Sequence, residues 1–344
     1  MEDWKKESRT METVFSSAYC TIAADAAKDW THGFLRHPQP QFSTAFRNGV
    51  LMYTYDTKHD FDDVNNSELN GRAWVLQERI LSRRILHFTE SHTYFACGDS
   101  VRCENFSKLT SPQRMDYYIL DPAFPSRLKQ SGYKRTIEFI QYMFKKYAQA
   151  GLSKRSDKEV ANLGLLERIQ HVLDSEYVYG TFSCFLSRLL LWRVSSTTRN
   201  AADDSEDVNL PSWSWMSHDQ IDFFPEESIL VPVGINKFHL KQLQVEVFEL
   251  LGPLVEVEHN EGHLAWHEDG EEAGTFWFDT HEKTPIRNCV VVGRSKSEHN
   301  MVFFVLLVTG TDENRYKRFG VGQVKPKIIS YEIGCKIRQL YGIE

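Results

Sequence analysis

The sequence has 344 residues, 41% of them hydrophobic and 25% charged, which is the balance of a globular protein long enough for one large core or two. Its 40 Lys and Arg against 47 Asp and Glu give a net charge of −7 that gathers in no basic stripe, so nucleic acid is not expected as a partner. The longest apolar run, residues 301–308, is far shorter than the ~20 residues that cross a bilayer, so no membrane span is expected.

The N-terminus and the cysteines indicate the compartment. Charged residues fill positions 2–7 and lead into no apolar stretch, so no secretory signal is expected. The six cysteines form no C-x-x-C pair, a distribution that fits neither a zinc module nor a disulfide framework. Reduced thiols in a cytoplasmic protein are expected, and neither a metal nor a cofactor is predicted.

The first hundred residues predict a mixture of helices and strands. Apolar residues recur at helical spacing and predict an amphipathic helix leading into an extended stretch at 19–24. The members of that apolar face are Trp4, Met11, Phe15, Ala18 and Ile22. Residues 33–70, with prolines and an acidic patch, predict a long surface excursion. A short helix over 72–81 and a hairpin over 85–97 follow.

The middle of the chain is predicted to be helical. Periodic apolar residues indicate helices over 136–150, 162–173 and 179–193. The polar, acidic stretch 199–209 has the composition of an exposed linker and marks the expected domain boundary.

Beyond that stretch the apolar period changes to two. Short runs rich in β-branched and aromatic residues, separated by Gly, Asn and Asp, predict an antiparallel sheet or sandwich. These runs are residues 245–248, 254–259, 263–267, 275–278, 289–292, 303–308 and 316–321.

Residues 72–88, RAWVLQERILSRRILHF, resemble the block R-x-W-x-x-Q-E-x-x-L-S-x-R-x-L-x-F of the heterokaryon incompatibility (HET) domain. The similarity is carried by Arg72, Trp74, Gln77, Glu78, Arg79, Ser82, Arg84, Leu86 and Phe88, and continues in Cys97 and Glu104. Farther along, Pro211, Trp213 and Trp215 are similar to a P-S-W-S-W element, and residues 318–322 to a late R-x-G-x-G strand.

Two earlier blocks of the family do not occur before this segment. They are an aromatic strand ending in W-G and a W-I-D-x-x-C-I-x-Q strand, so the sequence resembles an N-terminally truncated HET domain. What remains of its sheet in residues 1–108 is expected to expose an unpaired edge that invites pairing with another chain.

The resemblance implies an α+β protein in three segments. A partial, TIR-like α/β HET unit over 1–108 is expected, then a helical segment over 109–200 and a β-rich antiparallel domain over 201–344. The resemblance also implies a role in fungal nonself recognition, in which HET proteins help trigger growth arrest or programmed cell death. Protein partners, self-association among them, are the expected means of action.

Glu78 is a weak candidate for a catalytic carboxylate, because TIR domains have been linked to NAD cleavage. A structural ion pair of Glu78 with Arg72 or Arg79 is the favoured interpretation, since ion-pair networks often imitate functional sites. Trp74 is interpreted as a core anchor rather than a ligand contact.

A second candidate group lies near Trp213 and Trp215. With His218 and Asp219 as weak catalytic candidates, these tryptophans would form an aromatic wall around a small molecule; the favoured alternative is an aromatic plug between the helical and β segments. His259, His263 and His267 flank a turn signal, so they are expected to decorate a hairpin, with adventitious metal binding across the turn as the alternative.

Three functions follow from these residues. The leading one is an interaction protein of the incompatibility class. The alternatives are a TIR-like NAD-consuming enzyme using Glu78, and a HET-like protein recruited to small-molecule (secondary) metabolism through a pocket near Trp215 and His218. The sequence has neither a G-x-S-x-G motif nor a P-loop, which lowers the expectation of an enzyme.

Overall fold

A computed structural model describes most of the chain. The described residues are 2–35, 43–47, 50–54, 61–98, 100–104, 108–109, 123–195, 210–224, 231–232, 235–239, 242–250, 254–259, 262–267, 272–280, 286–295, 301–312, 315–329 and 341–343. The chain forms two compact units, Met1–Ser131 with Ala150–Val172, and Gly132–Gln149 with Leu173–Glu344. The acidic stretch 199–209 lies outside the described residues, and the domain limits at 108 and 200 stay predictions.

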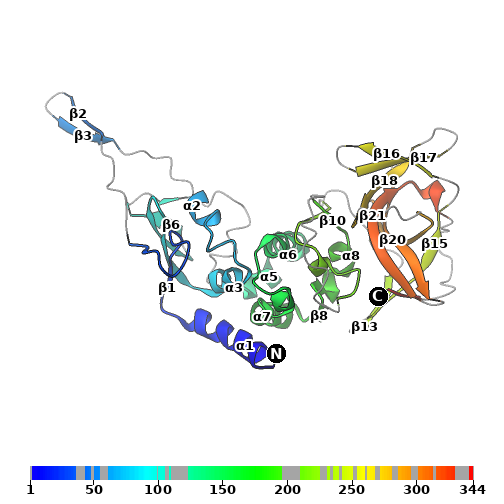
Figure 1. The fold of residues 1–344 in the computed structure, drawn as a ribbon, viewed down its shortest axis with the longest axis horizontal. Coiled ribbons are helices and arrows are strands. Elements are labelled where there is room, and N and C mark those ends of the chain that lie inside the picture. The colour runs from blue at the N-terminus through cyan, green and yellow to red at the C-terminus, as the bar shows by residue number, and fades with distance from the viewer. Residues whose placement is uncertain are drawn as a thin grey trace. The chain divides into compact units, whose positions relative to one another are not determined.

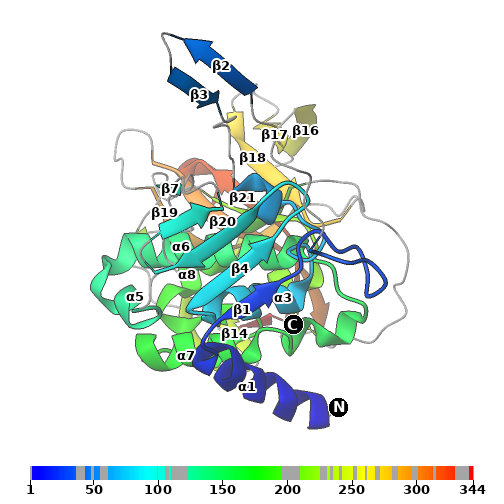
Figure 2. The same cartoon turned by 90° about the vertical axis from the view of Figure 1, so that its left-hand side faces the viewer.

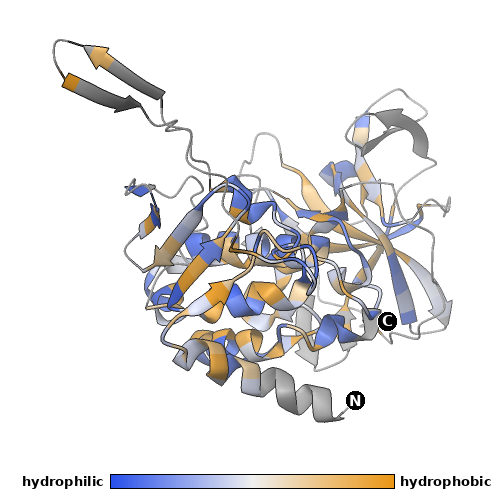
Figure 3. Cartoon of the chain, turned by 60° about the vertical axis from the view of Figure 1, so that its left-hand side comes forward, coloured by the Kyte–Doolittle hydropathy of each residue, from blue (hydrophilic) through white to orange (hydrophobic). Residues whose placement is uncertain are grey.

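Both units combine helices with sheets, so the α+β class is confirmed (Figures 1 and 3). The first unit contains α1 (Glu2–Ser17), β1 (Thr21–Ala23), β2 (Ser43–Arg47), β3 (Val50–Thr54), α2 (Asp62–Asn65), α3 (Ala73–Leu81), β4 (Arg84–Phe88), β5 (Thr93–Cys97), β6 (Ser100–Cys103), β7 (Lys108–Leu109), α5 (Ser126–Gln130), η1 (Arg155–Glu159) and α7 (Leu163–Leu173).

The first unit is organised around a five-stranded sheet in the order β1-β4-β5-β6-β7. β1 lies beside β4 and runs parallel to it (Figure 2). The other neighbours are antiparallel. The opening helix, the extended stretch after it, the helix over 72–81 and the hairpin over 85–97 are confirmed as α1, β1, α3 and β4–β5. Helix α3 ends where Ser82 adopts an extended backbone and its Oγ donates to the carbonyl of Glu78 at 2.7 Å.

One face of this sheet is buried under α2. Phe61 and Val64 pack there against buried side chains of β4, β5 and β6, which are Ile85, Tyr94, Ala96, Val101 and Cys103. The prediction that residues 33–70 form only a surface excursion is therefore wrong at Phe61 and Val64. Helix α2 has four residues, too few for a periodic apolar pattern to reveal it.

The predicted middle helices are correct in two of three cases. Residues 136–150 correspond to α6 (Gly132–Gln149), and 162–173 to α7. The helix predicted over 179–193 is confirmed only at residues 183–189, which form a short 3-10 turn and a short α-helix. It is wrong at its start, because Tyr179 and Gly180 both have positive φ and turn the chain between β8 (Tyr177–Val178) and β9 (Thr181–Phe182). A side chain at Gly180 would lie 2.5 Å from Trp215 Nε1, so the glycine is required.

The second unit is dominated by a large, mostly antiparallel sheet. Its elements, α6 aside, are β8, β9, η2 (Ser183–Phe185), α8 (Leu186–Leu189), β10 (Trp192–Val194), η3 (Trp215–Ser217), β11 (Ile221–Phe223), β12 (Val231–Pro232), β13 (Ile235–His239), β14 (Gln242–Val245), β15 (Val247–Glu249), β16 (Leu254–His259), β17 (Gly262–His267), β18 (Glu272–Phe278), β19 (Asn288–Arg294), β20 (Phe303–Asp312), β21 (Arg315–Val324), η5 (Pro326–Ile328) and β22 (Tyr341–Ile343). Every predicted C-terminal run lies on these strands; only the first is divided, between β14 and β15.

The centre of this sheet is buried on both faces. Along β20, Phe304, Leu306 and Val308 enter one core cluster, and the residues between them enter a second. A strand covered on both sides has no polar face, which explains the uninterrupted apolar run at 303–308. No helix among the described residues has the length and apolarity to cross a membrane.

Candidate functional site

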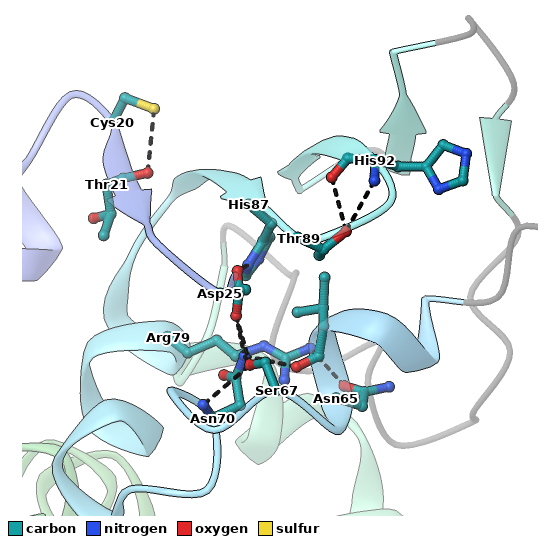
Figure 4. Close-up of polar contacts among 11 residues, drawn as sticks. Cys20, Thr21, Asp25, Asn65, Ser67, Asn70, Arg79, His87, Thr89 and His92 are labelled. Atoms are coloured by element: carbon teal, nitrogen blue, oxygen red, sulfur yellow. Dashed lines mark hydrogen bonds and ion pairs between the residues drawn. The ribbon is translucent and has the colours of Figure 1, made fainter. Parts of the chain in front are cut away.

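A buried aspartate–histidine pair lies where β1 and β4 end in the first unit (Figure 4). Asp25 follows β1 by two residues, and His87 is the penultimate residue of β4. His87 Nδ1 lies 2.8 Å from Asp25 Oδ2, and both side chains are almost completely buried. Because parallel strands present their carboxyl ends at one edge, this is a usual place for ligand sites in sheets of this kind.

The other oxygen of Asp25 is also satisfied. Ser67 Oγ donates to Asp25 Oδ1 at 2.8 Å, and Asn70 Nδ2 donates to the same atom at 2.7 Å. An ionised carboxylate can only accept hydrogen bonds, so His87 must carry its proton on Nδ1. Asp25 therefore fixes the tautomer of His87.

The second ring nitrogen of His87 is left with an unprotonated lone pair. His87 Nε2 is buried and has no hydrogen-bond partner among the described residues. Burial lowers the pKa of His87, and this outweighs the hydrogen bond to Asp25, which acts in the opposite direction. The imidazole is thus held neutral, with Nε2 as a hydrogen-bond acceptor.

Tyr94 lies beside His87 on the same face of the sheet. The two residues are cross-strand partners, and Phe61 contacts both rings edge-on, at centroid distances of 5.5 Å from His87 and 5.6 Å from Tyr94. Burial, followed by the charge of Asp63, raises the pKa of Tyr94, so its hydroxyl keeps the proton. By distance and angle the hydroxyl has no hydrogen-bond partner within the described part of the chain. Asp63 accepts from Ser91, and its carboxylate is near enough to Tyr94 to raise the pKa of the tyrosine.

The helix that carries the HET-like block buries Gln77 more completely than Trp74. Gln77 is fully buried, and its Oε1 accepts from the backbone N–H of Leu165 in α7 at 3.0 Å. Trp74 is only partly buried, so its interpretation as a core anchor is correct only in part. Gln77 is the residue that joins α3 to α7.

Glu78 is partly buried on the same helix. Burial raises its pKa, and the charge of Arg72 opposes this shift. Within the described residues neither Arg72 nor Arg79 comes within 4 Å of its carboxylate, so the structure does not contain the predicted ion pair. Arg79 instead donates to Asn65 Oδ1 at 2.9 Å and lies over the ring of Phe61.

Other residues of the block have structural contacts. The hydroxyl of Ser82 donates its proton to the carbonyl of Glu78, so Thr21 Oγ1 is the donor in its 2.7 Å hydrogen bond with Ser82 Oγ. This bond connects β1 to the end of α3. Arg84 lies over the ring of Tyr19. The remaining contacts are Phe88 edge-on to Phe34, Cys97 Sγ to the carbonyl of Ser100, and the backbone N–H of Glu104 to Thr93; Leu86 is partly buried.

The Pro-Ser-Trp-Ser-Trp element lies in the second unit, within its core. Trp213 packs among sheet residues, and Trp215 contacts Phe144 and Tyr147 of α6 at 4.9 and 6.2 Å between centroids. Trp215 Nε1 donates to the carbonyl of Gly180 at 2.7 Å. The interpretation of this element as an aromatic plug between helix and sheet is confirmed.

His218 and Asp219 follow the plug. His218 packs against the ring of Trp192 at 5.0 Å, and Asp219 is exposed. The structure thus places these two candidates in the second unit and Glu78 in the first.

Arg318 of the R-x-G-x-G strand is a fully buried cation. Its guanidinium pairs with both oxygens of Asp279, at 2.9 and 3.1 Å, and lies 3.5 Å from the ring centre of Trp192. It also donates to the carbonyls of Leu190 and Trp192. Burial lowers the pKa of Arg318 and Asp279 opposes the shift, so the arginine stays charged and joins β21 to the segment before β10.

The three C-terminal histidines lie on the predicted hairpin, β16–β17. Its register pairs His263 with Glu258, and His259 with Gly262, so the two histidines are not partners across the turn. No group of three metal-binding side chains exists among the described residues.

The Asp25–His87 pair was not predicted from the sequence. His87 has the same strand phase as buried Ile85, and a histidine in the apolar phase of a strand is a signal for a buried polar group. Asp25 gives a weaker signal, as an acidic residue directly after an extended stretch. Ser67 and Asn70 gave no such signal, because they lie in residues 33–70, which were predicted to be on the surface.

Comparison with known families finds a similarity in the first unit. Residues 1–78 match the family model described as Heterokaryon incompatibility protein (HET), which confirms the resemblance over that segment. The similarity to the heterokaryon incompatibility family is thus established for this N-terminal segment. The match includes Asp25, Ser67 and Asn70 and ends before His87. Searches of curated proteins and of solved structures find no match.

Proposed function

We propose that this protein acts in fungal nonself recognition, in the cytoplasm, by pairing the β1 edge of its five-stranded sheet with another protein chain, a second copy of itself first of all. The HET match supports the cellular role, growth arrest or programmed cell death on contact between unlike cells. The exposed edge supports the mode of action.

The edge strand β1 carries the proposal. Among the described strands it pairs only with β4, so one side of its backbone is available for a new strand. Ile22 on this strand is 62% exposed, and Tyr19 just before it is 82% exposed. An apolar side chain on an unpaired edge strand favours β-augmentation, in which backbone hydrogen bonds supply affinity.

A charge on the strand tests the proposal. Ile22→Lys leaves the β1–β4 pairing intact but opposes edge-to-edge association, as lysines on natural edge strands do. Light scattering after size exclusion should show concentration-dependent association of the wild type and a monomer for Ile22→Lys. Trp30→Lys, at a residue 96% exposed outside any strand, is the matched control and should associate like the wild type. A wild type that stays monomeric at high concentration contradicts the proposal.

One observation favours the enzymatic alternative. Glu78 has a raised pKa and forms no ion pair within 4 Å among the described residues, although the charge of Arg72 acts on it. Perturbed carboxylates of this kind occur at catalytic sites. A TIR-like NAD hydrolase would lose NAD cleavage in Glu78→Gln while keeping its fold. If the protein acts by association instead, neither the wild type nor Glu78→Gln should consume NAD.

A further inference from the structure

Two buried polar atoms of the first unit have complementary hydrogen-bonding character. His87 Nε2 is an acceptor, because Asp25 holds the proton on Nδ1. Tyr94 Oη carries a proton and is a donor. The residues are neighbours on β4 and β5, both under Phe61, and neither atom has a hydrogen-bond partner of good geometry among the described residues.

Two such atoms together are unusual in a protein core. Buried polar atoms are nearly always hydrogen-bonded, and leaving one unpaired costs free energy. Asp25, by contrast, is fully paired, because it accepts from Ser67, Asn70 and His87. The network thus orients His87 and leaves Nε2 without a partner. A ligand-binding side chain that is held in place by hydrogen bonds from a second layer of residues has this arrangement.

We propose that His87 and Tyr94 form a binding site for a small uncharged group that carries both a donor and an acceptor, a hydroxyl or a primary amide. The ligand donates to His87 Nε2 and accepts from Tyr94 Oη. An anion is disfavoured, because the site is buried and the lone pair of His87 Nε2 would face the negative charge. This site is independent of the β1 edge.

The first test uses small probes and the full chain. Nitrogen NMR of labelled histidine reports directly on His87 Nε2. Acetamide and 2-propanol should each shift this resonance in a saturable way, with a Kd on the order of 1 mM or weaker for ligands of this size. Acetate should give no saturable shift. Absence of saturation with both uncharged probes, as a permanently bound water would cause, overturns the proposal.

Two variants separate the contacts. Tyr94→Phe removes only the donor and should weaken probe binding roughly three- to tenfold, the value of one hydrogen bond. His87→Asn keeps a donor toward Asp25, removes Nε2 and should abolish binding. Tyr147→Phe, at a buried tyrosine of the second unit, is the matched control and should leave the affinity unchanged. Equal affinities in all three variants contradict the site.

Thermal stability gives a second readout without any probe. Because Tyr94 Oη has no hydrogen-bond partner of good geometry in the described part of the chain, Tyr94→Phe should leave Tm unchanged or raise it. A clear fall in Tm would show that the hydroxyl is bonded within the protein, for example to Asp63, whose charge already raises the pKa of Tyr94, and would overturn its role as a free donor.

Discussion

At the scale of single residues, buried charges and buried polar side chains account for much of the sequence pattern. Arg318 lies in the R-x-G-x-G strand because one guanidinium satisfies Asp279 and two carbonyls at once. Gln77 lies in the HET-like block because it joins two helices. In both cases the side chain completes hydrogen bonds that no apolar residue could form.

Arg318→Met should destabilise the second unit by about 3–5 kcal/mol, because Asp279 would remain as an unpaired buried charge. Lys325 and Glu272 form an exposed pair, with side chains 42% and 45% exposed, and provide the control. Lys325→Met should change stability by less than about 1 kcal/mol. Urea denaturation measures both, and similar losses would show that burial does not govern the Arg318 pair.

His87 should make the first unit sensitive to acid. Its pKa is lowered from 6.5 in the folded state, so the unfolded chain binds a proton there first and stability falls as the pH drops below about 6.5. The loss is at most about 1.4 kcal/mol per pH unit and stops below the folded pKa. His87→Asn should flatten the profile between pH 7 and 5, whereas the exposed His171→Asn should not. An unchanged profile in His87→Asn contradicts the assignment.

At the scale of elements, close contacts between the backbone of one strand and a side chain of the next require glycine at certain positions. The hydropathy pattern does not reveal these positions. Gly322 of β21 lies against the buried ring of Phe276 in β18, and a Cβ there would be 2.5 Å from Phe276 Cδ1. Gly310 of β20 has free space, with Tyr316 as its nearest neighbour at 3.9 Å. The R-x-G-x-G pattern thus reflects packing rather than a nucleotide loop.

Gly322→Ala should destabilise the second unit by about 1–3 kcal/mol through overpacking. Gly310→Ala should be neutral or slightly stabilising, because no atom blocks the methyl group. Chemical denaturation of the two variants distinguishes the cases. Equal denaturation midpoints for the two variants would mean that the ring of Phe276 moves freely enough to accommodate the added methyl group.

Gln77→Leu should cost about 1–3 kcal/mol, because the buried N–H of Leu165 would lose its acceptor. Exposed Gln130→Leu serves as control and should change little. Calorimetry compares the two. If Gln77→Leu were as stable as the wild type, packing alone would hold α3 against α7.

The sequence predicted those elements whose period is long enough to measure. Alternation located β16 to β21, and helical spacing located α1, α3, α6 and α7. It failed at α2, which is too short, and at the start of the helix predicted over 179–193, where the turn at Gly180 outweighs an apolar run. The polar pair Asp25 and His87 was missed because its residues, 62 positions apart, meet only through the parallel pairing of β1 with β4.

At the scale of the whole molecule, the chain divides its features between two units. The first contains the HET match, the β1 edge and the His87–Tyr94 site. The second is a sheet stabilised by two cores and by Arg318. The proposed recognition function belongs to the first unit, and variants there should separate association from catalysis.

Growth of fungal cells that express the protein tests the central claim most directly. The wild type should arrest growth, Glu78→Gln and Trp30→Lys should do so equally, and Ile22→Lys should allow normal growth at the same protein level. Arrest by Ile22→Lys as strong as that of the wild type would contradict recognition through the β1 edge. Loss of arrest in Glu78→Gln, with the fold intact and cellular NAD preserved, would establish the enzyme instead.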